Sequence, residues 1–412
     1  MTTGQPFSEG DDTSLWADAK SKVTALREAG TIDDATAKRL LDENKAALLE
    51  KLGPAYARAI DWFSEDVDNT PDEAPKAIDL PRGEEYYAHR LRYYTTTDMT
   101  AAQIHQVGLD EVARIRGEME AIMEAVNFEG SLAEFFDFVR DSDRFYYPDT
   151  PEGRQAFIDE TEFYLERVNK KLPEYFGVLP KAGLVVRRVE SFREQDGGAA
   201  FYEQGTPDGS RPGVYYMHLS AMRSNNRTDL QTTAYHEGNP GHHMQVSIAL
   251  ERDDLPLFRN NVWYSGYGEG WALYAEQVAA EMGVYDDPYY EFGRLVSEIF
   301  RAIRLVVDTG MHSLGWTEEE AVQYMLANSA VPEVSVRSEI RRYIVWPGQA
   351  TAYKIGMLKI LELRSTAQEQ LGDDFDIRAF HDLVLAGGSL PLSILERRVD
   401  DWIASVAASS DD

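Results

Sequence analysis

The chain has 412 residues, and its 41 Lys and Arg against 71 Asp and Glu leave a formal net charge of −30. Nucleic-acid binding draws most of its affinity from Lys and Arg side chains that displace counterions from phosphate, so an acidic chain is not expected to bind DNA or RNA. The same charge disfavours an anionic membrane surface, and no apolar stretch approaches the ~20 residues of a membrane-spanning helix. We therefore expect neither nucleic-acid nor membrane partners.

The chain contains no cysteine. A bound metal ion would therefore have to be held by His, Asp or Glu, because thiolate ligands are missing. The opening residues, MTTGQPFSEGDD, have neither the basic start nor the apolar segment of a secretory signal. A cytoplasmic location is the resulting prediction.

The elements expected in chain order begin with a helical region. Leu15, Val23 and Leu26 recur at helical spacing, and further leucines continue the pattern. Residues 67–82 then hold three Pro and four acidic residues without periodicity, which is typical of a surface connection. We therefore place a boundary between an N-terminal helical region, residues 1–80, and a larger domain, residues 81–412.

Helices with clear start signals are predicted after this boundary. Thr100, Ser131 and Thr317 are each followed three residues later by Gln or Glu, which is the spacing of a capping box. Thr150 precedes a Pro that suits the first position of a helix. The fold class is therefore predicted to be mainly α.

Two segments are predicted to be strands. Residues 184–189 and 214–219 are rich in β-branched and aromatic side chains, and glycine or proline bounds each of them. We expect them to form a small antiparallel sheet beside the helix that follows, around residue 236.

Three of the eight histidines lie close together, at His236, His242 and His243. His-Glu followed by a second His is similar to the zinc-peptidase motif, in which both His bind the metal and the Glu takes a proton from water. The spacing differs from that motif, however. In a regular helix His242 would be turned about 240° from His236, and His243 would lie about 10.5 Å further along the axis. A regular helix therefore cannot bring two of these rings to one metal ion.

Gly238, Pro240 and Gly241 indicate how the site could form. Proline removes a backbone donor and clashes with the preceding turn, while glycine tolerates unusual backbone angles. A bulge or a break at these residues could bring the ring of His242 beside that of His236. The alternative is a purely structural histidine cluster packed over a loop.

A third ligand is expected from Glu269, which lies between two glycines at the start of an apolar helical run. It follows His242 by 27 residues, which leaves room for one helix to return antiparallel. Glu276 lies two turns further along the same face. It is expected either to accept a hydrogen bond from a ligand histidine or to be an ordinary solvated helix residue.

Four motifs then point to a known family. They are His-Glu-Gly-x-Pro-Gly-His-x-x-Gln at 236–245, Glu-Gly-Trp-Ala-x-Tyr-x-Glu at 269–276, Arg-Tyr-x-x-x-Pro-Gly-Gln-Ala at 342–350 and Gly-Ser-Leu-Pro-Leu at 388–392. In this order they resemble the bacterial domain-of-unknown-function 885 family, from about residue 80 onward. That family is similar to helical zinc peptidases such as the Taq-type carboxypeptidase and the oligopeptidases. The resemblance implies a zincin-like helical fold and zinc-dependent hydrolysis of amide bonds.

The resemblance also implies roles by matched position. One zinc ion per chain would be held by His236, His242 and Glu269, with Glu237 as the general base. Around these ligands, His243 and Glu276 are expected to supply supporting hydrogen bonds.

Further positions are candidates for contacts with the substrate. Arg342 could hold a carboxylate, and Tyr343 or Tyr353 could stabilise the developing oxyanion. Each of these three side chains could instead pack a pair of helices. Tyr216 lies in the strand at 214–219, which is expected to be the edge strand against which an extended substrate lies.

The predicted function is that of a zinc metallopeptidase of the carboxypeptidase or oligopeptidase type, acting on a peptide. The region before residue 80 is shorter than the resemblance leads one to expect, and in the related peptidases that region helps to wall the cleft. A more open cleft would suit a zinc amidase or imidase acting on small non-peptide amides. A second copy or a partner chain could also complete the cleft, or the chain could be a non-catalytic partner subunit that retains the fold.

Overall fold

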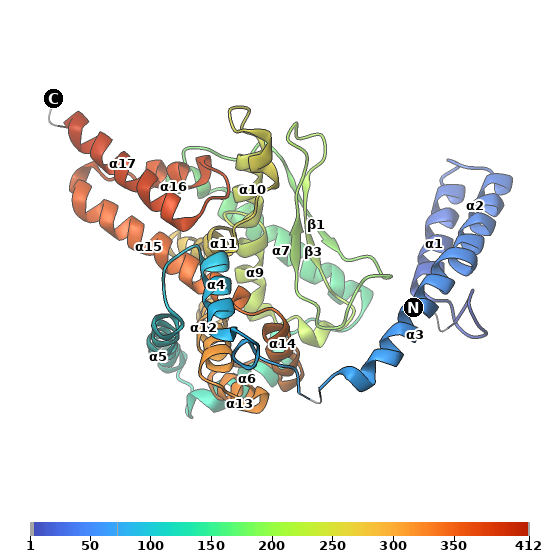
Figure 1. Cartoon of the computed structure of the whole chain (residues 1–412). Coiled ribbons are helices and arrows are strands. Elements are labelled where there is room, and N and C mark those ends of the chain that lie inside the picture. The colour runs from blue at the N-terminus through green and yellow to red at the C-terminus, as the bar shows by residue number, and fades with distance from the viewer. Residues whose placement is uncertain (1–3, 72, 411–412) are drawn as a thin grey trace. The chain divides into compact units, whose positions relative to one another are not determined.

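The computed structural model of the chain describes residues 4–71 and 73–410, and helices predominate in it (Figure 1). The described residues form two compact units. One comprises Met1–Ala74 with Arg188–Asp196, and the other comprises Pro75–Arg187 with Gly197–Asp412. The domain border near residue 80 stays a prediction, and the structure additionally groups residues 188–196 with the N-terminal helices.

The first unit is built from α1 (Ser14–Glu28), α2 (Asp34–Ala47) and α3 (Gly53–Asp66). A π-helical segment, Leu48–Leu52, joins α2 to α3. The start of α2 is capped locally, because the Asp33 carboxylate accepts a hydrogen bond from the Thr36 N–H at 2.7 Å. Such a cap satisfies one of the backbone donors that the first turn of a helix leaves unpaired.

The second unit contains the remaining helices. In chain order they are α4 (Gly83–Thr95), α5 (Ala101–Ala125), α6 (Leu132–Asp141), α7 (Pro151–Asn169), α8 (Leu172–Tyr175), α9 (Arg227–Glu237), α10 (His242–Leu250), α11 (Ser265–Glu281), α12 (Pro288–Ser313), α13 (Glu318–Asn328), α14 (Glu333–Val345), α15 (Ala352–Leu371), α16 (Ile377–Ala386) and α17 (Leu392–Ser410). The prediction of a mainly α chain is confirmed.

The four helix starts predicted in this unit are confirmed as well. Thr100, Ser131 and Thr317 each form a capping box with the residue three positions later. Thr150 caps α7 by accepting a hydrogen bond from the Gly153 N–H at 3.1 Å, with proline at the first helical position. These signals lie within four residues of sequence, so tertiary packing is not needed to interpret them.

The small sheet is also present, beside α9 and α10. The two expected strands are β1 (Leu184–Arg188) and β3 (Gly213–Met217), and β2 (Phe201–Glu203) is a third strand that was not predicted. β2 pairs antiparallel with β3, and the strand order is β1-β3-β2. The expectation that the strand carrying Tyr216 forms the edge is therefore wrong, because β3 lies in the centre and Tyr216 is paired with Phe201 of β2.

Glycines allow α11 and α15 to approach closely. A Cβ added at Gly270 would lie 2.5 Å from the Cα of Gly356, and one added at Gly356 would overlap the carbonyl oxygen of Gly266. Carbon atoms in contact are normally about 3.5–4.0 Å apart, so any side chain at these positions would push the two helices away from each other. The contact fixes the backbone on either side of Glu269.

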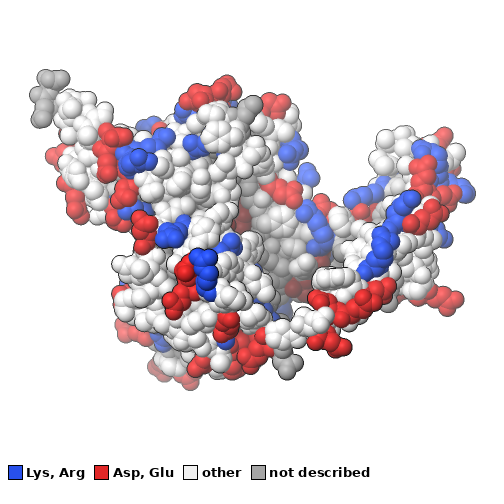
Figure 2. All heavy atoms as spheres, viewed as in Figure 1, with Lys and Arg blue, Asp and Glu red and all other residues white. Residues whose placement is uncertain are grey.

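Acidic and basic side chains are interspersed over the face of the molecule drawn in Figure 2. Many of them form ion pairs on the same helix, such as Arg39 with Glu43 at 2.8 Å and Arg337 with Glu333 at 2.7 Å. Exposed pairs of this kind contribute little to stability, so the buried charges of the second unit are more informative.

Candidate metal centre

The helix that carries the histidines is broken where the sequence suggested. α9 ends at Glu237 and α10 begins at His242, and an Asn239–Pro240 cis peptide lies between them. Gly241 must be glycine for steric reasons, because a Cβ there would collide with the carbonyl oxygen of His236. The break brings the imidazole rings of His236 and His242 to a centroid distance of 4.8 Å. Two histidines that are six residues apart in the sequence thus have their rings in contact.

The third expected ligand reaches the same point from α11. Glu269 Oε2 lies 3.5 Å from His242 Nε2 and 3.9 Å from His236 Nε2. One ligand atom from each of the three residues can be chosen so that all lie within 4.8 Å of one another. Tetrahedral zinc with ligand distances of about 2.0–2.2 Å requires separations of about 3.3–3.6 Å, so small adjustments would suffice. The donor set therefore fits a divalent metal ion such as zinc.

Glu276 holds one of these imidazoles in place. Its Oε1 lies 2.7 Å from His236 Nδ1, which leaves Nε2 of the same ring directed toward Glu269. On the other ring, Gln245 Oε1 lies 3.4 Å from His242 Nδ1. Partners of this kind fix the tautomer and the orientation of metal-binding histidines. Gln245 was part of the sequence motif, but no role was predicted for it.

His243 points away from the cluster. Its Nδ1 lies 3.1 Å from the Tyr202 hydroxyl, and its Nε2 lies 3.1 Å from the carbonyl oxygen of Ala182. The structure thus places this ring between α10 and the sheet instead of beside the ligand histidines. The supporting role predicted for His243 is not the one that its contacts indicate.

Glu237 lies beside the cluster, with 8% of the residue exposed. Burial raises its pKa to about 7, and the negative charge of Glu269 acts in the same direction, while His242 opposes the shift. Burial lowers the pKa of His242, but a hydrogen bond and the charge of Glu269 outweigh this effect and raise it to about 9. A metal ion that used His242 would therefore have to displace a proton.

The cluster opens into a cavity of about 480 Å³. Its walls come from β2 and the residues before it, from α9 to α12, and from α15. The lining residues are Ala199, Ala200, Phe201, Tyr202, Gln204, His236, Glu237, His242, Val246, Trp263, Glu269, Arg301, Arg304 and Tyr353. Edge strand β2 thus lines the same cavity as the three candidate metal ligands.

Three of the four side chains expected to contact a substrate lie outside this lining. Arg342 donates to Gln349 Oε1 at 2.8 Å and to Glu339. The hydroxyl of Tyr343 donates to Glu339 Oε2 at 2.6 Å and accepts from Arg304 Nε at 2.8 Å. Tyr353 does line the cavity. The buried Tyr216 is stacked on Phe201 at a centroid distance of 5.1 Å and does not line the cavity either.

Two arginines that the sequence reading missed lie in the cavity wall instead. Arg301 and Arg304 are three residues apart on one face of α12, within an otherwise apolar run. Arg304 is only 7% exposed, and its Nη1 has no hydrogen-bond partner among the described residues, nor has Nε of Arg301. Arg304 also forms an ion pair with Glu339 at 3.1 Å, but a buried donor atom that is left unpaired is costly, so these two arginines at a cavity are candidates for binding an anion. Their spacing within an apolar helix was the available signal.

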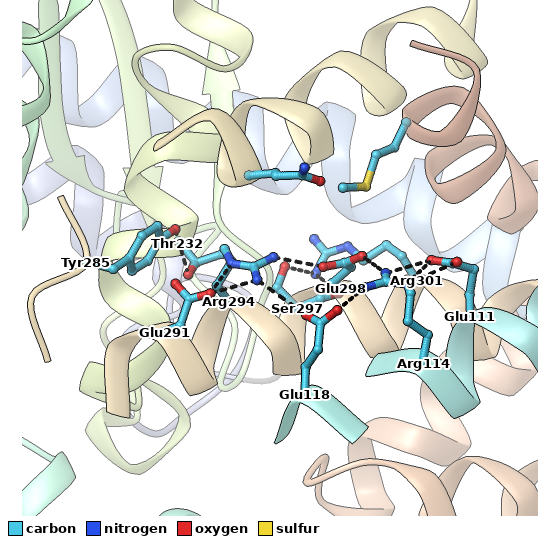
Figure 3. Close-up of polar contacts among 12 residues, drawn as sticks. Glu111, Arg114, Glu118, Thr232, Tyr285, Glu291, Arg294, Ser297, Glu298 and Arg301 are labelled. Carbon is cyan, nitrogen blue, oxygen red and sulfur yellow. Dashed lines mark hydrogen bonds and ion pairs between the residues drawn. The ribbon is translucent and has the colours of Figure 1, made fainter. Parts of the chain in front are cut away.

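Polar contacts along the same helix hold Arg301 in position, as Figure 3 shows. Arg301 Nη1 donates to Ser297 Oγ at 2.7 Å, one turn earlier on α12. Glu298 accepts from Arg294 at 2.8 Å and from the fully buried Lys354 at 2.6 Å. Burial raises the pKa of Glu298, but the charges of Lys354, Arg294 and Arg114 lower it to about 2. This ionic network ties α12 to α15 and α5.

The chain was compared with curated proteins and with solved structures. No curated protein matches the chain. It is 37% identical to the crystal structure of the putative lipoprotein from Colwellia psychrerythraea, with a TM-score of 0.87, over 94% of this chain and 67% of that one. A putative lipoprotein of unknown function from Shewanella oneidensis is 22% identical, with a TM-score of 0.67, over 92% of this chain and 69% of that one.

A third structure is more distant. The M32 carboxypeptidase from Deinococcus radiodurans R1 aligns over 97% of this chain and 86% of that one, with 11% identity and a TM-score of 0.39. No functional conclusion rests on a likeness of this size.

The prediction of a cytoplasmic location is wrong. Both of the more similar structures are described as lipoproteins, a class of protein that a covalently attached lipid anchors to a membrane. Among the described residues, no helix combines the length and the apolar composition needed to cross a bilayer.

The family assignment rests on a match that covers nearly the whole chain. A family described as bacterial proteins of unknown function, DUF885, matches residues 5–399 and thus begins well before residue 80, where the sequence motifs suggested the resemblance would start. The chain therefore belongs to the bacterial DUF885 family.

Proposed function

We propose that the protein is a zinc-dependent hydrolase of amide bonds, and that its substrates are peptides. One observation carries this proposal: His236, His242 and Glu269 present their ligand atoms to one point, and the carboxylate of Glu237 faces the same cavity. Two imidazoles and one carboxylate form the ligand set of many catalytic zinc sites, which keep a further position open. A structural site would usually be closed by a fourth protein ligand.

The chain's own residues have separate roles in this proposal. Zinc held by the cluster would supply Lewis acidity and lower the pKa of water. Glu237 would accept the proton of the attacking water and return it to the nitrogen of the leaving amine. Tyr353, which lines the cavity, would donate a hydrogen bond to the carbonyl oxygen as negative charge develops on it. Tyr343 would act only by holding Arg304.

The cavity walls support a peptide substrate. β2 is an edge strand of the small sheet and lines the cavity, so an extended peptide could pair with it as an added strand. Arg301 and Arg304 supply positive charge with unpartnered donors at Nε and Nη1. A guanidinium fork suits a carboxylate, so these two residues take the substrate-binding role first assigned to Arg342.

Metal analysis tests the first half of the proposal. Purified protein should contain about one zinc per chain by plasma mass spectrometry, and His236→Ala and Glu269→Ala should lose it. His243→Ala is a matched control, because this neighbouring imidazole faces Tyr202 and Ala182, and it should keep the metal. A wild-type protein that binds no zinc when zinc is supplied would rule out the proposed function.

Turnover tests the second half. Wild-type protein should hydrolyse members of a peptide panel, and Glu237→Gln should keep its zinc while losing activity by about 10²–10⁴-fold, the usual contribution of a general base. Equal activity of Glu237→Gln and wild type would exclude the assigned role.

A small-molecule amidase is the second candidate function. The cavity volume of about 480 Å³ falls within the range typical of small-ligand sites, and this observation favours it. Turnover of acylated or cyclic small amides without turnover of any peptide would select this alternative.

A further inference from the structure

We propose that a second, adjoining cavity is a subsite for an alkylammonium group of the substrate, with Asp229 as the binding carboxylate. The inference rests on the proposed function, because it describes where one end of the substrate would lie. The alkylammonium group is either the free amino end of a peptide or a lysine side chain.

The adjoining cavity has a volume of about 240 Å³. It shares Ala199 and Ala200, directly before β2, with the cavity of the metal cluster. Asp229 and Thr233 of α9 line it on another side, together with Asn225 and Asn226 from the turn before that helix. An extended segment lying along residues 199–202 would therefore pass from one cavity into the other.

The positions on α9 give the length of this segment. Asp229, Thr233 and His236 are four and three residues apart, so they lie on one face of the helix. At 1.5 Å per residue, Asp229 is about 10.5 Å from His236 along the axis. An extended chain advances about 3.3 Å per residue. About three residues would thus separate an ammonium group at Asp229 from a carbonyl group at the metal cluster.

The carboxylate of Asp229 is the group of this cavity that its surroundings leave uncommitted. It accepts a hydrogen bond from the Thr228 hydroxyl at the long distance of 3.4 Å, although a carboxylate can accept several hydrogen bonds. Asn225, by contrast, is fixed by hydrogen bonds to two backbone carbonyl oxygens, at 3.0 and 3.1 Å. Asn226 is likewise fixed by the carbonyl oxygen of Val139 at 2.9 Å.

Among the residues that the structure describes, no basic side chain forms an ion pair with Asp229. Burial raises the pKa of Asp229 to about 7, although the charge of Arg301 acts in the opposite direction. Arg301 itself donates a hydrogen bond to Ser297 on its own helix. A partly buried carboxylate without an ion-pair partner is costly to retain. A substrate cation would compensate that cost by forming a charge-assisted hydrogen bond with the carboxylate.

Binding measurements in the Glu237→Gln background test the subsite without turnover. Peptides with one to four residues before the susceptible bond are compared as pairs, with a free or an acetylated amino end, by calorimetry on zinc-loaded protein. The free form should bind about tenfold tighter or more, as expected for a hydrogen bond between charged groups, with the largest difference at about three residues. Acetylated peptides with lysine or norleucine at each position distinguish the side chain from the amino end.

Asp229→Asn is the decisive variant, because it removes the charge and keeps the shape. It should reduce the preference for the cationic member of each pair to less than about twofold, while thermal unfolding shows that it remains folded. Asp159→Asn, an exposed aspartate on α7, is the matched control and should leave the preference unchanged. Equal binding of both members in the starting protein, no binding of either, or a preference that survives Asp229→Asn would overturn the subsite.

The two proposals fail in different ways. The protein could bind the cationic peptides more tightly through Asp229 while the wild type hydrolyses no peptide. This result would refute the proposed function and retain the subsite. Hydrolysis of free and acetylated peptides at equal kcat/KM, with equal binding, would remove the subsite and leave the hydrolase.

Discussion

Gly356→Ala should lower the zinc affinity of the candidate metal centre, although residue 356 is not one of the candidate metal ligands. A Cβ at this position would lie 2.8 Å from the Cα of Gly270 and would overlap the carbonyl oxygen of Gly266. Restoring a normal contact of about 3.5 Å requires α11 and α15 to separate by about 0.7 Å or more. Metal–ligand distances stay within about 0.2 Å of their preferred values, so a lasting shift of α11 by this amount would misplace Glu269, which precedes Gly270 on that helix. We expect a loss of at least about tenfold in zinc affinity, as found for changes to groups that position ligands.

Stability should fall in the same variant. Overpacking in a close-packed core costs about 1–3 kcal/mol, which urea unfolding of the zinc-free protein can measure, with zinc affinity obtained by competition with a chelator. Gly117→Ala is the matched control: it lies on α5, where a Cβ would meet nothing within 4 Å, so it should raise stability by up to about 1 kcal/mol and leave zinc binding unchanged. If Gly356→Ala kept full stability and zinc affinity, the close contact would not be what positions Glu269.

Three further predictions concern charged and titrating groups. Burial lowers the pKa of His381 to about 3, whereas the unfolded chain takes up the proton below about pH 6.5, so stability should fall by up to about 1.4 kcal/mol per pH unit on acidification between these values. His381→Asn should flatten that part of the profile in urea unfolding, and an unchanged slope would contradict the assignment. Lys354→Met should cost about 3–5 kcal/mol, because it leaves Glu298 as a buried charge with fewer partners, and adding Glu298→Gln should recover part of the loss. Arg304→Gln should raise KM for peptides with a free carboxyl end by about tenfold relative to KM for the corresponding peptide amides. Arg342→Gln is the control and should change KM for the two kinds of peptide by the same factor. If the two variants had equal effects, the assignment of Arg304 to the substrate carboxylate would be refuted.

The helix starts were predictable because each depends on a few neighbouring residues. The capping boxes at Thr100, Ser131 and Thr317 need only their own first turn. The break after Glu237 could be foreseen for the same reason, since proline and glycine act on the local backbone. The position of Glu269 beside the two histidines could be inferred only as a reachable return of the chain, because its distances to them depend on how α11 packs against α9, α10 and α15.

The wrong or missing predictions concern features that depend on contacts between residues far apart in the sequence. Strand order in a sheet is not a property of either strand, so the central position of β3 could not be derived from its sequence. β2 is three residues long and follows a run of small residues, which gives periodicity little to act on. Arg301 and Arg304 lie on a helix that is buried on most sides, where arginine would ordinarily be read as a solvent-facing residue.

Several backbone groups at the break between α9 and α10 have hydrogen-bond partners. The N–H of Gly238 donates to the Ala234 carbonyl at 2.8 Å, and that of Gly241 donates to the Tyr235 carbonyl at 2.9 Å. The indole N–H of Trp271 donates to the carbonyl oxygen of Pro240 at 2.9 Å. Helix ends usually fray and exchange their amide hydrogens quickly, because these groups lack partners. The amides of Gly238 and Gly241 should instead exchange as slowly as those inside a helix, and the imidazoles on either side are held together before any ligand arrives.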